Sequence, residues 1–133
     1  MILKNTDKTD VRITMKTCQD GENFEHTYTG TFSKKSGKTY LNYRDGNEPC
    51  SLITDGNEIR LVRMTSGTRM VFEKGARHDC FYPTPIGNIP VAIETDAISH
   101  DLEMNNRLKI RYKLYVEDDN FLNNEINITI EEI

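Results

Sequence analysis

A chain of 133 residues is about the size of one ordinary domain, since domains usually hold roughly 100–200 residues. Hydrophobic residues make up 36% of the chain and the mean hydropathy is −0.64, which excludes a membrane-embedded protein and an intrinsically disordered one. Seventeen basic and 21 acidic residues give a net charge of −4, so we expect no nucleic-acid partner.

The cysteines and the N-terminus point to a reducing compartment. Cys18, Cys50 and Cys80 are odd in number and widely spaced, and no CxxC pair occurs. The N-terminus has no apolar stretch as long as a secretory signal, and no run approaches the roughly 18 apolar residues of a spanning helix. We therefore expect reduced thiols, no membrane association and a cytoplasmic location.

Apolar residues alternate with polar ones along most of the chain, which predicts β-strands. In chain order, the residues expected on one shared face are Val11, Ile13 and Met15; Phe24, His26, Tyr28, Gly30 and Phe32; Ile59, Leu61 and Arg63; Met70 and Phe72; Val91, Ile93 and Thr95; Leu108, Ile110, Tyr112 and Leu114; Ile126, Ile128 and Ile130. Each predicted strand thus contributes one face to a common core.

Turn-forming pairs separate the predicted strands at intervals of roughly 8–12 residues. They are Asp20-Gly21, Ser36-Gly37, Asp45-Gly46, Asp55-Gly56, Ser66-Gly67 and Asn105-Asn106, followed by Asp118-Asp119-Asn120. The pattern predicts an all-β, antiparallel barrel of about 8–10 strands, formed by a single domain over residues 1–133. A two-sheet sandwich is the alternative fold.

The expected hairpins can be set in register from their turns. Short turns place Leu61 opposite Cys50 on one neighbouring strand and opposite Phe72 on the other, and the final hairpin sets Ile110 opposite Ile128. In each case the paired residues belong to the same apolar face, so the alternation and the turns agree.

An ordered series of short motifs resembles a known family. The series is Tyr28-Thr-Gly-Thr-Phe32, Tyr40-Leu-Asn-Tyr43, Arg63-Met-Thr-Ser-Gly67, Met70-Val-Phe-Glu-Lys-Gly75, Tyr82-Pro-Thr-Pro-Ile-Gly87, Ile93-Glu-Thr95 and Ile110-Arg-Tyr112. The chain resembles the YwiB-like family of small, uncharacterised bacterial β-barrel proteins. The resemblance implies a calycin-like, broadly lipocalin-like barrel in a cytoplasmic bacterial protein, and no activity. The chain has no tryptophan, so it lacks the Gly-x-Trp motif of true lipocalins.

Arg63 is the foremost candidate binding residue. Its parity matches Ile59 and Leu61, which places a guanidinium on the predicted inner face. Because an unpaired buried charge costs several kcal/mol, Arg63 needs a partner. The partner is either the carboxylate or phosphate of a ligand, held in a bidentate way, or an internal acid such as Glu48.

Three further inward positions carry polar groups. His26, Tyr28 and Tyr112 place an imidazole and two phenols among the apolar residues, as small-molecule pockets do. The alternative is that each makes one internal hydrogen bond within a filled core. Together with Arg63 they form the predicted lumen site.

Other patterns are weaker candidates for a functional site. The basic series Arg107, Lys109, Arg111 and Lys113 faces outward, either toward phosphates or as a solvated strand face balanced by neighbouring acids. His78-Asp79-Cys80 lacks the paired ligands of a structural zinc site, so we expect no metal and no cofactor. No nucleophile elbow, phosphate loop, dinucleotide fingerprint or HExxH motif occurs, so we expect no enzyme.

Two functional hypotheses remain. In the first, a cytoplasmic barrel binds a small apolar or anionic molecule in its lumen through Arg63, His26, Tyr28 and Tyr112. In the second, a barrel filled by its own side chains acts through its outer surface as a protein-interaction or oligomerising module, as a monomer or a homodimer. A cavity of a few hundred Å³ would separate the two hypotheses.

Overall fold

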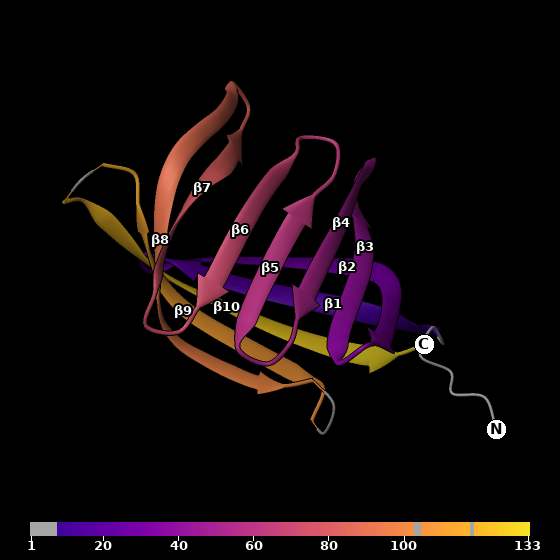
Figure 1. Ribbon diagram of the computed structural model, residues 1–133. Helices are drawn as coiled ribbons and strands as arrows, with labels where there is room; N and C mark the ends of the chain where they lie inside the picture. Colours follow the sequence, from indigo (N-terminus) through magenta and orange to yellow (C-terminus); the bar gives the residue numbers. More distant parts are fainter. Residues whose placement is uncertain (1–7, 103–104, 118) are drawn as a thin grey trace.

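The computed structural model describes residues 8–102, 105–117 and 119–133, with Pro83 described by its backbone alone. These residues form ten antiparallel strands and no helix (Figure 1). The strands are β1 (Lys8–Gln19), β2 (Glu22–Lys35), β3 (Lys38–Asp45), β4 (Glu48–Thr54), β5 (Glu58–Arg63), β6 (Thr68–Glu73), β7 (Arg77–Thr84), β8 (Gly87–Asp101), β9 (Arg107–Tyr115) and β10 (Phe121–Glu132).

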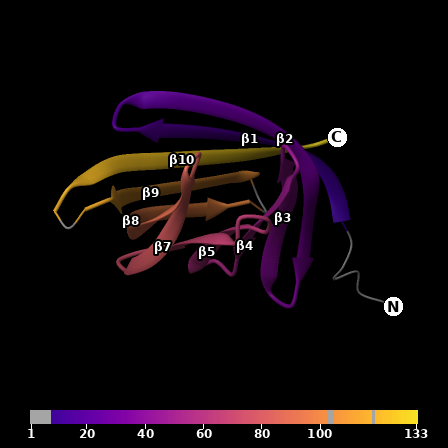
Figure 2. The same cartoon turned by 90° about the horizontal axis from the view of Figure 1, so that it is seen from above.

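All ten strands belong to one sheet in the order β6-β5-β4-β3-β2-β1-β10-β9-β8-β7. The strands at the two ends of this order, β6 and β7, follow each other in the chain and lie side by side, so the sheet curls into a nearly closed barrel (Figures 1 and 2). The predicted barrel is confirmed, and the sandwich alternative is wrong because the described strands form a single sheet.

The barrel is closed by contact rather than by a full ladder of hydrogen bonds. Within the described residues, β6 pairs with β5 and β7 pairs with β8, and an isolated bridge joins Lys74, directly after β6, to Thr95 of β8. We call the contact between β6 and β7 the seam. The backbone groups that face it lack the strand partner that the interior strands have on both sides.

The alternation predicted the inner faces correctly. Ile13, Leu52, Ile59, Phe72 and Ile110 are each at most 2% exposed and lie in one core cluster. Burying such side chains contributes roughly 1.5–3 kcal/mol each, which is the main term that holds a barrel of this size together.

Three predicted registers are wrong by two residues. Leu61 lies opposite Leu52 and Met70, and Ile110 lies opposite Ile126. Four residues connect the paired positions of the β4–β5 and β5–β6 hairpins instead of two, and five residues separate Tyr115 from Phe121 in the final hairpin instead of three. A register shift of two residues keeps every side chain on the same face of the sheet, so the predicted core residues are still correct.

Gly30 marks a sharp change in the sheet. Residues 22–29 of β2 pair with β1 alone, and β2 begins to pair with β3 only at Gly30, opposite Tyr43. A Cβ built on Gly30 would lie 2.1 Å from the backbone oxygen of Asn42, so the close approach of β3 requires glycine. Beyond this point the β1–β2 hairpin continues as an arm, which we define as residues 15–29.

Candidate functional site

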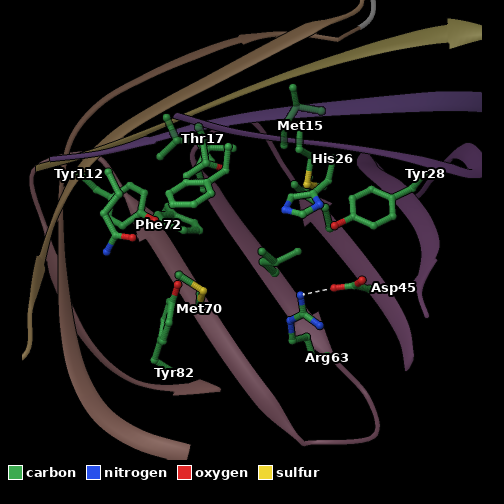
Figure 3. A pocket seen from close by; sticks show the side chains of 17 residues that line it. Met15, Thr17, His26, Tyr28, Asp45, Arg63, Met70, Phe72, Tyr82 and Tyr112 are labelled. Carbon is green, nitrogen blue, oxygen red and sulfur yellow. Dashed lines mark hydrogen bonds and ion pairs between the residues drawn. The ribbon is translucent and has the colours of Figure 1, made fainter. Parts of the chain in front are cut away.

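A cavity of about 390 Å³ lies between the β1–β2 arm and the inner face of β4, β5 and β6 (Figure 3). All four residues predicted for the lumen line this one cavity: Arg63, His26, Tyr28 and Tyr112. Its volume falls within the range of about 300–1,000 Å³ that is common for small-molecule sites. Met15, Leu61, Met70 and Phe72 supply apolar walls.

Arg63 lies at one end of the cavity and binds two acids. Its Nη2 donates to Asp45 Oδ2 at 2.7 Å and its Nη1 donates to Glu48 Oε1 at 2.8 Å, while 26% of its side chain stays exposed. Burial would lower the pKa of the guanidinium, but these hydrogen bonds outweigh that effect and raise it. The expected internal partner Glu48 is present, although Cys50 is the residue opposite Arg63 in the ladder.

Glu48 also ties this end of the cavity to the β5–β6 turn. Its Oε2 accepts a hydrogen bond from the backbone N–H of Ser66 at 2.7 Å. This bond and the contact with Arg63 lower the pKa of Glu48 to about 2. The group of Arg63, Asp45 and Glu48 therefore carries two negative charges and one positive charge at neutral pH.

Two aromatic residues on β2 line the upper wall in Figure 3. The rings of His26 and Tyr28 stack with centroids 6.2 Å apart, and Tyr28 also packs on Tyr43 at 4.7 Å. Burial raises the pKa of Tyr28, and the Asp45 carboxylate adds to that rise. His26 is exposed, because the part of β2 that carries it pairs with β1 along one edge and with no described strand along the other edge.

Tyr112 closes the opposite end of the cavity. It is 3% exposed, and its ring meets Phe72 edge to face at 4.9 Å. Burial raises the pKa of Tyr112 to about 12, and a hydrogen bond with the Asn124 side chain acts in the other direction. The phenol is therefore neutral and available for hydrogen bonding at physiological pH.

Tyr112 belongs to a polar row that crosses four adjacent strands. The register aligns Gln19 with Asn124, Asn124 with Tyr112, and Tyr112 with Thr95. Gln19 and Tyr112 line the cavity. Asn124 and Thr95 are 4% and 1% exposed, and Asn124 Oδ1 and Thr95 Oγ1 lack a hydrogen-bond partner among the described residues. This row gives the cavity a neutral polar end.

Sequence reasoning missed Thr17, Gln19, Tyr82 and Asp45 as lining residues. The first two continue the alternation of Ile13 and Met15, so a longer first strand would have found them. Asp45 precedes a turn glycine, where an acid is common for local reasons, and only the three-dimensional structure reveals its contact with Arg63.

The outward basic series on β9 is partly neutralised by acids. Lys109 Nζ lies 3.1 Å from Glu125 Oε1, and Lys113 Nζ lies 3.5 Å from Asp96 Oδ1 and 4.0 Å from Glu94 Oε1. These ion pairs favour a solvated strand face balanced by neighbouring acids over a phosphate-binding surface.

The remaining sequence candidates lie apart from the cavity. Cys18, Cys50 and Cys80 are free thiols. His78 Nε2 lies 2.9 Å from Glu73 Oε1, so its nearest polar partner comes from β6 and not from Cys80. In the residues that the structure describes, no helix has the length and apolarity needed to cross a membrane.

Comparisons with known proteins support this architecture. The crystal structure of the YwiB protein from Bacillus subtilis superposes with a TM-score of 0.81 over 95% of this chain and 93% of that chain, at 23% sequence identity. This shared fold confirms the barrel that the resemblance implies. No curated protein sequence matches the chain. A family model matches residues 9–128, and the chain therefore belongs to the family described as Domain of unknown function (DUF1934).

Proposed function

We propose that this protein is a non-enzymatic binding barrel that holds a small, uncharged and mostly apolar molecule in its cavity. The observation that supports the proposal most is the convergence of apolar walls and a few polar groups around about 390 Å³ of space. A barrel filled by its own side chains would leave no such volume.

The charges around the cavity favour a neutral ligand. The guanidinium of Arg63 already binds Asp45 and Glu48, so an anionic ligand would have to compete with these two carboxylates. An anionic ligand would also meet the excess negative charge of this group. Of the two ligand classes expected from the sequence, the apolar one fits better than the anionic one.

The opposite end of the cavity supplies hydrogen bonds without charge. Gln19 offers an amide and Tyr112 a neutral phenol, and the Tyr112 ring packs on Phe72. A ligand with an aromatic or aliphatic body and a carbonyl, amide or hydroxyl group would match these donors and acceptors. The three free thiols support our further proposal of a cytoplasmic location.

The test uses two environment-sensitive naphthalene dyes of similar size. We expect the neutral dye 6-propionyl-2-(dimethylamino)naphthalene to bind saturably with one site per chain. The anionic dye 1-anilinonaphthalene-8-sulfonate should bind at least about tenfold more weakly, a difference of roughly 1.4 kcal/mol. Absence of saturable binding of the neutral dye, or preference for the anionic dye, would contradict the proposal.

A pair of variants locates the binding site. Thr17→Trp fills the cavity from β1, whereas Thr14→Trp adds the same side chain to the outer face of the same strand. We expect Thr17→Trp to abolish binding of the neutral dye and Thr14→Trp to leave it unchanged. Equal effects of the two substitutions would show that the dye binds elsewhere.

A second candidate function rests on the exposed tip of the β7–β8 hairpin. Phe81 is 58% exposed and Ile86 is 95% exposed, which is unusual for large apolar side chains near one another in sequence. These residues favour the interaction-module hypothesis. Sedimentation of the parent chain and of Ile86→Ser tests it, because a self-associating tip predicts a dimer that the substitution disrupts.

A further inference from the structure

Three potential metal ligands meet at one end of the seam. Glu58 begins β5, Glu73 ends β6 and His78 is the second residue of β7. Their ligand atoms all lie within 4.8 Å of one another, and the His78 imidazole and the Glu73 carboxylate are 2.9 Å apart. All three residues are half-buried, so the cluster is less solvated than an ordinary surface group of acids.

The charges in this cluster are not balanced. Glu58 and Glu73 lie directly opposite each other on neighbouring strands, an arrangement in which like charges destabilise a sheet. Arg60 binds Glu58 and offsets one of the two charges. Among the flanking cations, Lys74 is exposed and Arg77 places its guanidinium over the Tyr115 ring, 4.2 Å from the centroid. A bound cation would relieve the remaining repulsion.

The donor set indicates which cations fit. Two carboxylate oxygens and one imidazole nitrogen suit Zn²⁺ and similar divalent transition metals, whereas Ca²⁺ and Mg²⁺ prefer oxygen ligands alone. Ligands around Zn²⁺ lie about 2.0–2.2 Å from the ion, so Glu58 would have to move inward. Its side chain is flexible enough for that movement once Arg60 releases it.

We propose that Glu58, Glu73 and His78 bind one divalent transition-metal ion that links β5, β6 and β7 across the seam. The proposal is independent of the ligand cavity. It departs from the sequence expectation of no metal, because the spacing of the three residues matches no metal motif and they become neighbours only when β5 pairs with β6 and β7 turns back beside β6. Since the described seam lacks a continuous ladder, the ion would also stabilise the barrel.

The experiment titrates Zn²⁺ into the full chain after treatment with a chelator, in competition with a chromophoric zinc indicator. We expect one ion per chain and a rise in the thermal midpoint. His78→Ala and Glu73→Gln should each weaken binding by at least about tenfold. The matched control His26→Ala removes an imidazole outside the cluster and should leave the affinity unchanged. Glu73→Gln keeps the side-chain shape, so its result does not depend on tolerance of His78→Ala.

Arg60→Ala distinguishes a metal site from a simple ion-pair network. If Glu58 is a ligand, removing Arg60 frees it and tightens Zn²⁺ binding severalfold. Equal affinity in His78→Ala and His26→Ala, or loss of binding on Cys80→Ser, would overturn the proposal. Binding of Mg²⁺ as tight as that of Zn²⁺ would overturn the assignment to a transition metal.

Discussion

Glu48 links Arg63 to the Ser66 backbone, and this double contact sets how the protein responds to acid. The ordinary pKa of a glutamate is near 4.5, and the two contacts lower that of folded Glu48 to about 2. A group whose pKa is lower in the folded state stabilises the fold fully above its unfolded pKa and loses that effect as the pH falls toward the folded value.

We therefore predict that Glu48→Gln flattens the pH dependence of stability between about pH 4.5 and pH 2. The thermal midpoint of the parent chain should fall more steeply over this window than that of the variant. Glu22→Gln is the control, because Glu22 is exposed at the tip of the β1–β2 hairpin. Parallel curves for the parent and Glu48→Gln would contradict the proposed role of the double contact.

Thr95 is another residue with a measurable consequence. Its hydroxyl is buried and lacks a partner among the described residues, and such a group costs about 1–3 kcal/mol when left unpaired. Valine has nearly the same shape without the hydroxyl. We predict that Thr95→Val raises the free energy of unfolding by about 1 kcal/mol, measured by urea denaturation. A loss of stability would show that the hydroxyl has a partner such as a buried water.

At the scale of strands, Gly30 lets β3 approach β2 at the point beyond which residues 22–29 pair with β1 alone. We predict that Gly30→Ala costs about 1–3 kcal/mol, since the added methyl would overlap the backbone oxygen of Asn42. Thr29→Ala, one residue away and exposed, should change stability by less than about 0.5 kcal/mol. Similar urea midpoints for the two variants would contradict this account of the corner.

The hairpins show how far the sequence predicts this fold. Asp20 and Gly21 both have positive φ and form the two-residue turn that their identities predict. The β4–β5 loop fails the same rule. There the Asp55 carboxylate accepts hydrogen bonds from the N–H groups of Asn57 and Glu58, which stabilises a four-residue loop. Whether a carboxylate accepts such hydrogen bonds depends on the local backbone geometry, which cannot be predicted from the residue types alone.

The candidate site was predictable to a similar extent. Parity placed Arg63 and Tyr112 on the inner face because alternation is a property of each strand alone. Asp45 and the cluster of Glu73 and His78 were not predictable, since their contacts depend on how neighbouring strands curve around the barrel. Contacts within a strand follow from sequence, whereas contacts across the barrel require the closed structure.

At the scale of the molecule, the seam interrupts the hydrogen-bonded network around the barrel. β1 and β10 are paired on both sides, while the described residues of β6 and β7 have strand partners on one side only. We predict that amides facing the seam exchange with solvent on the order of a hundredfold faster than amides in the middle of β1 and β10. Hydrogen-exchange mass spectrometry or NMR measures this, and uniform protection around the barrel would contradict it.

Residues 22–29 of β2, which pair with one strand only, affect how a molecule could reach the cavity. Phe24, His26 and Tyr28 line the cavity from a segment that pairs with β1 alone. If the cavity holds the ligand proposed above, that ligand can enter beside residues 22–29 of β2 without separating them from a second strand, because they pair with β1 alone. We therefore expect fast association and dissociation of the neutral dye, since no pair of strands has to open first.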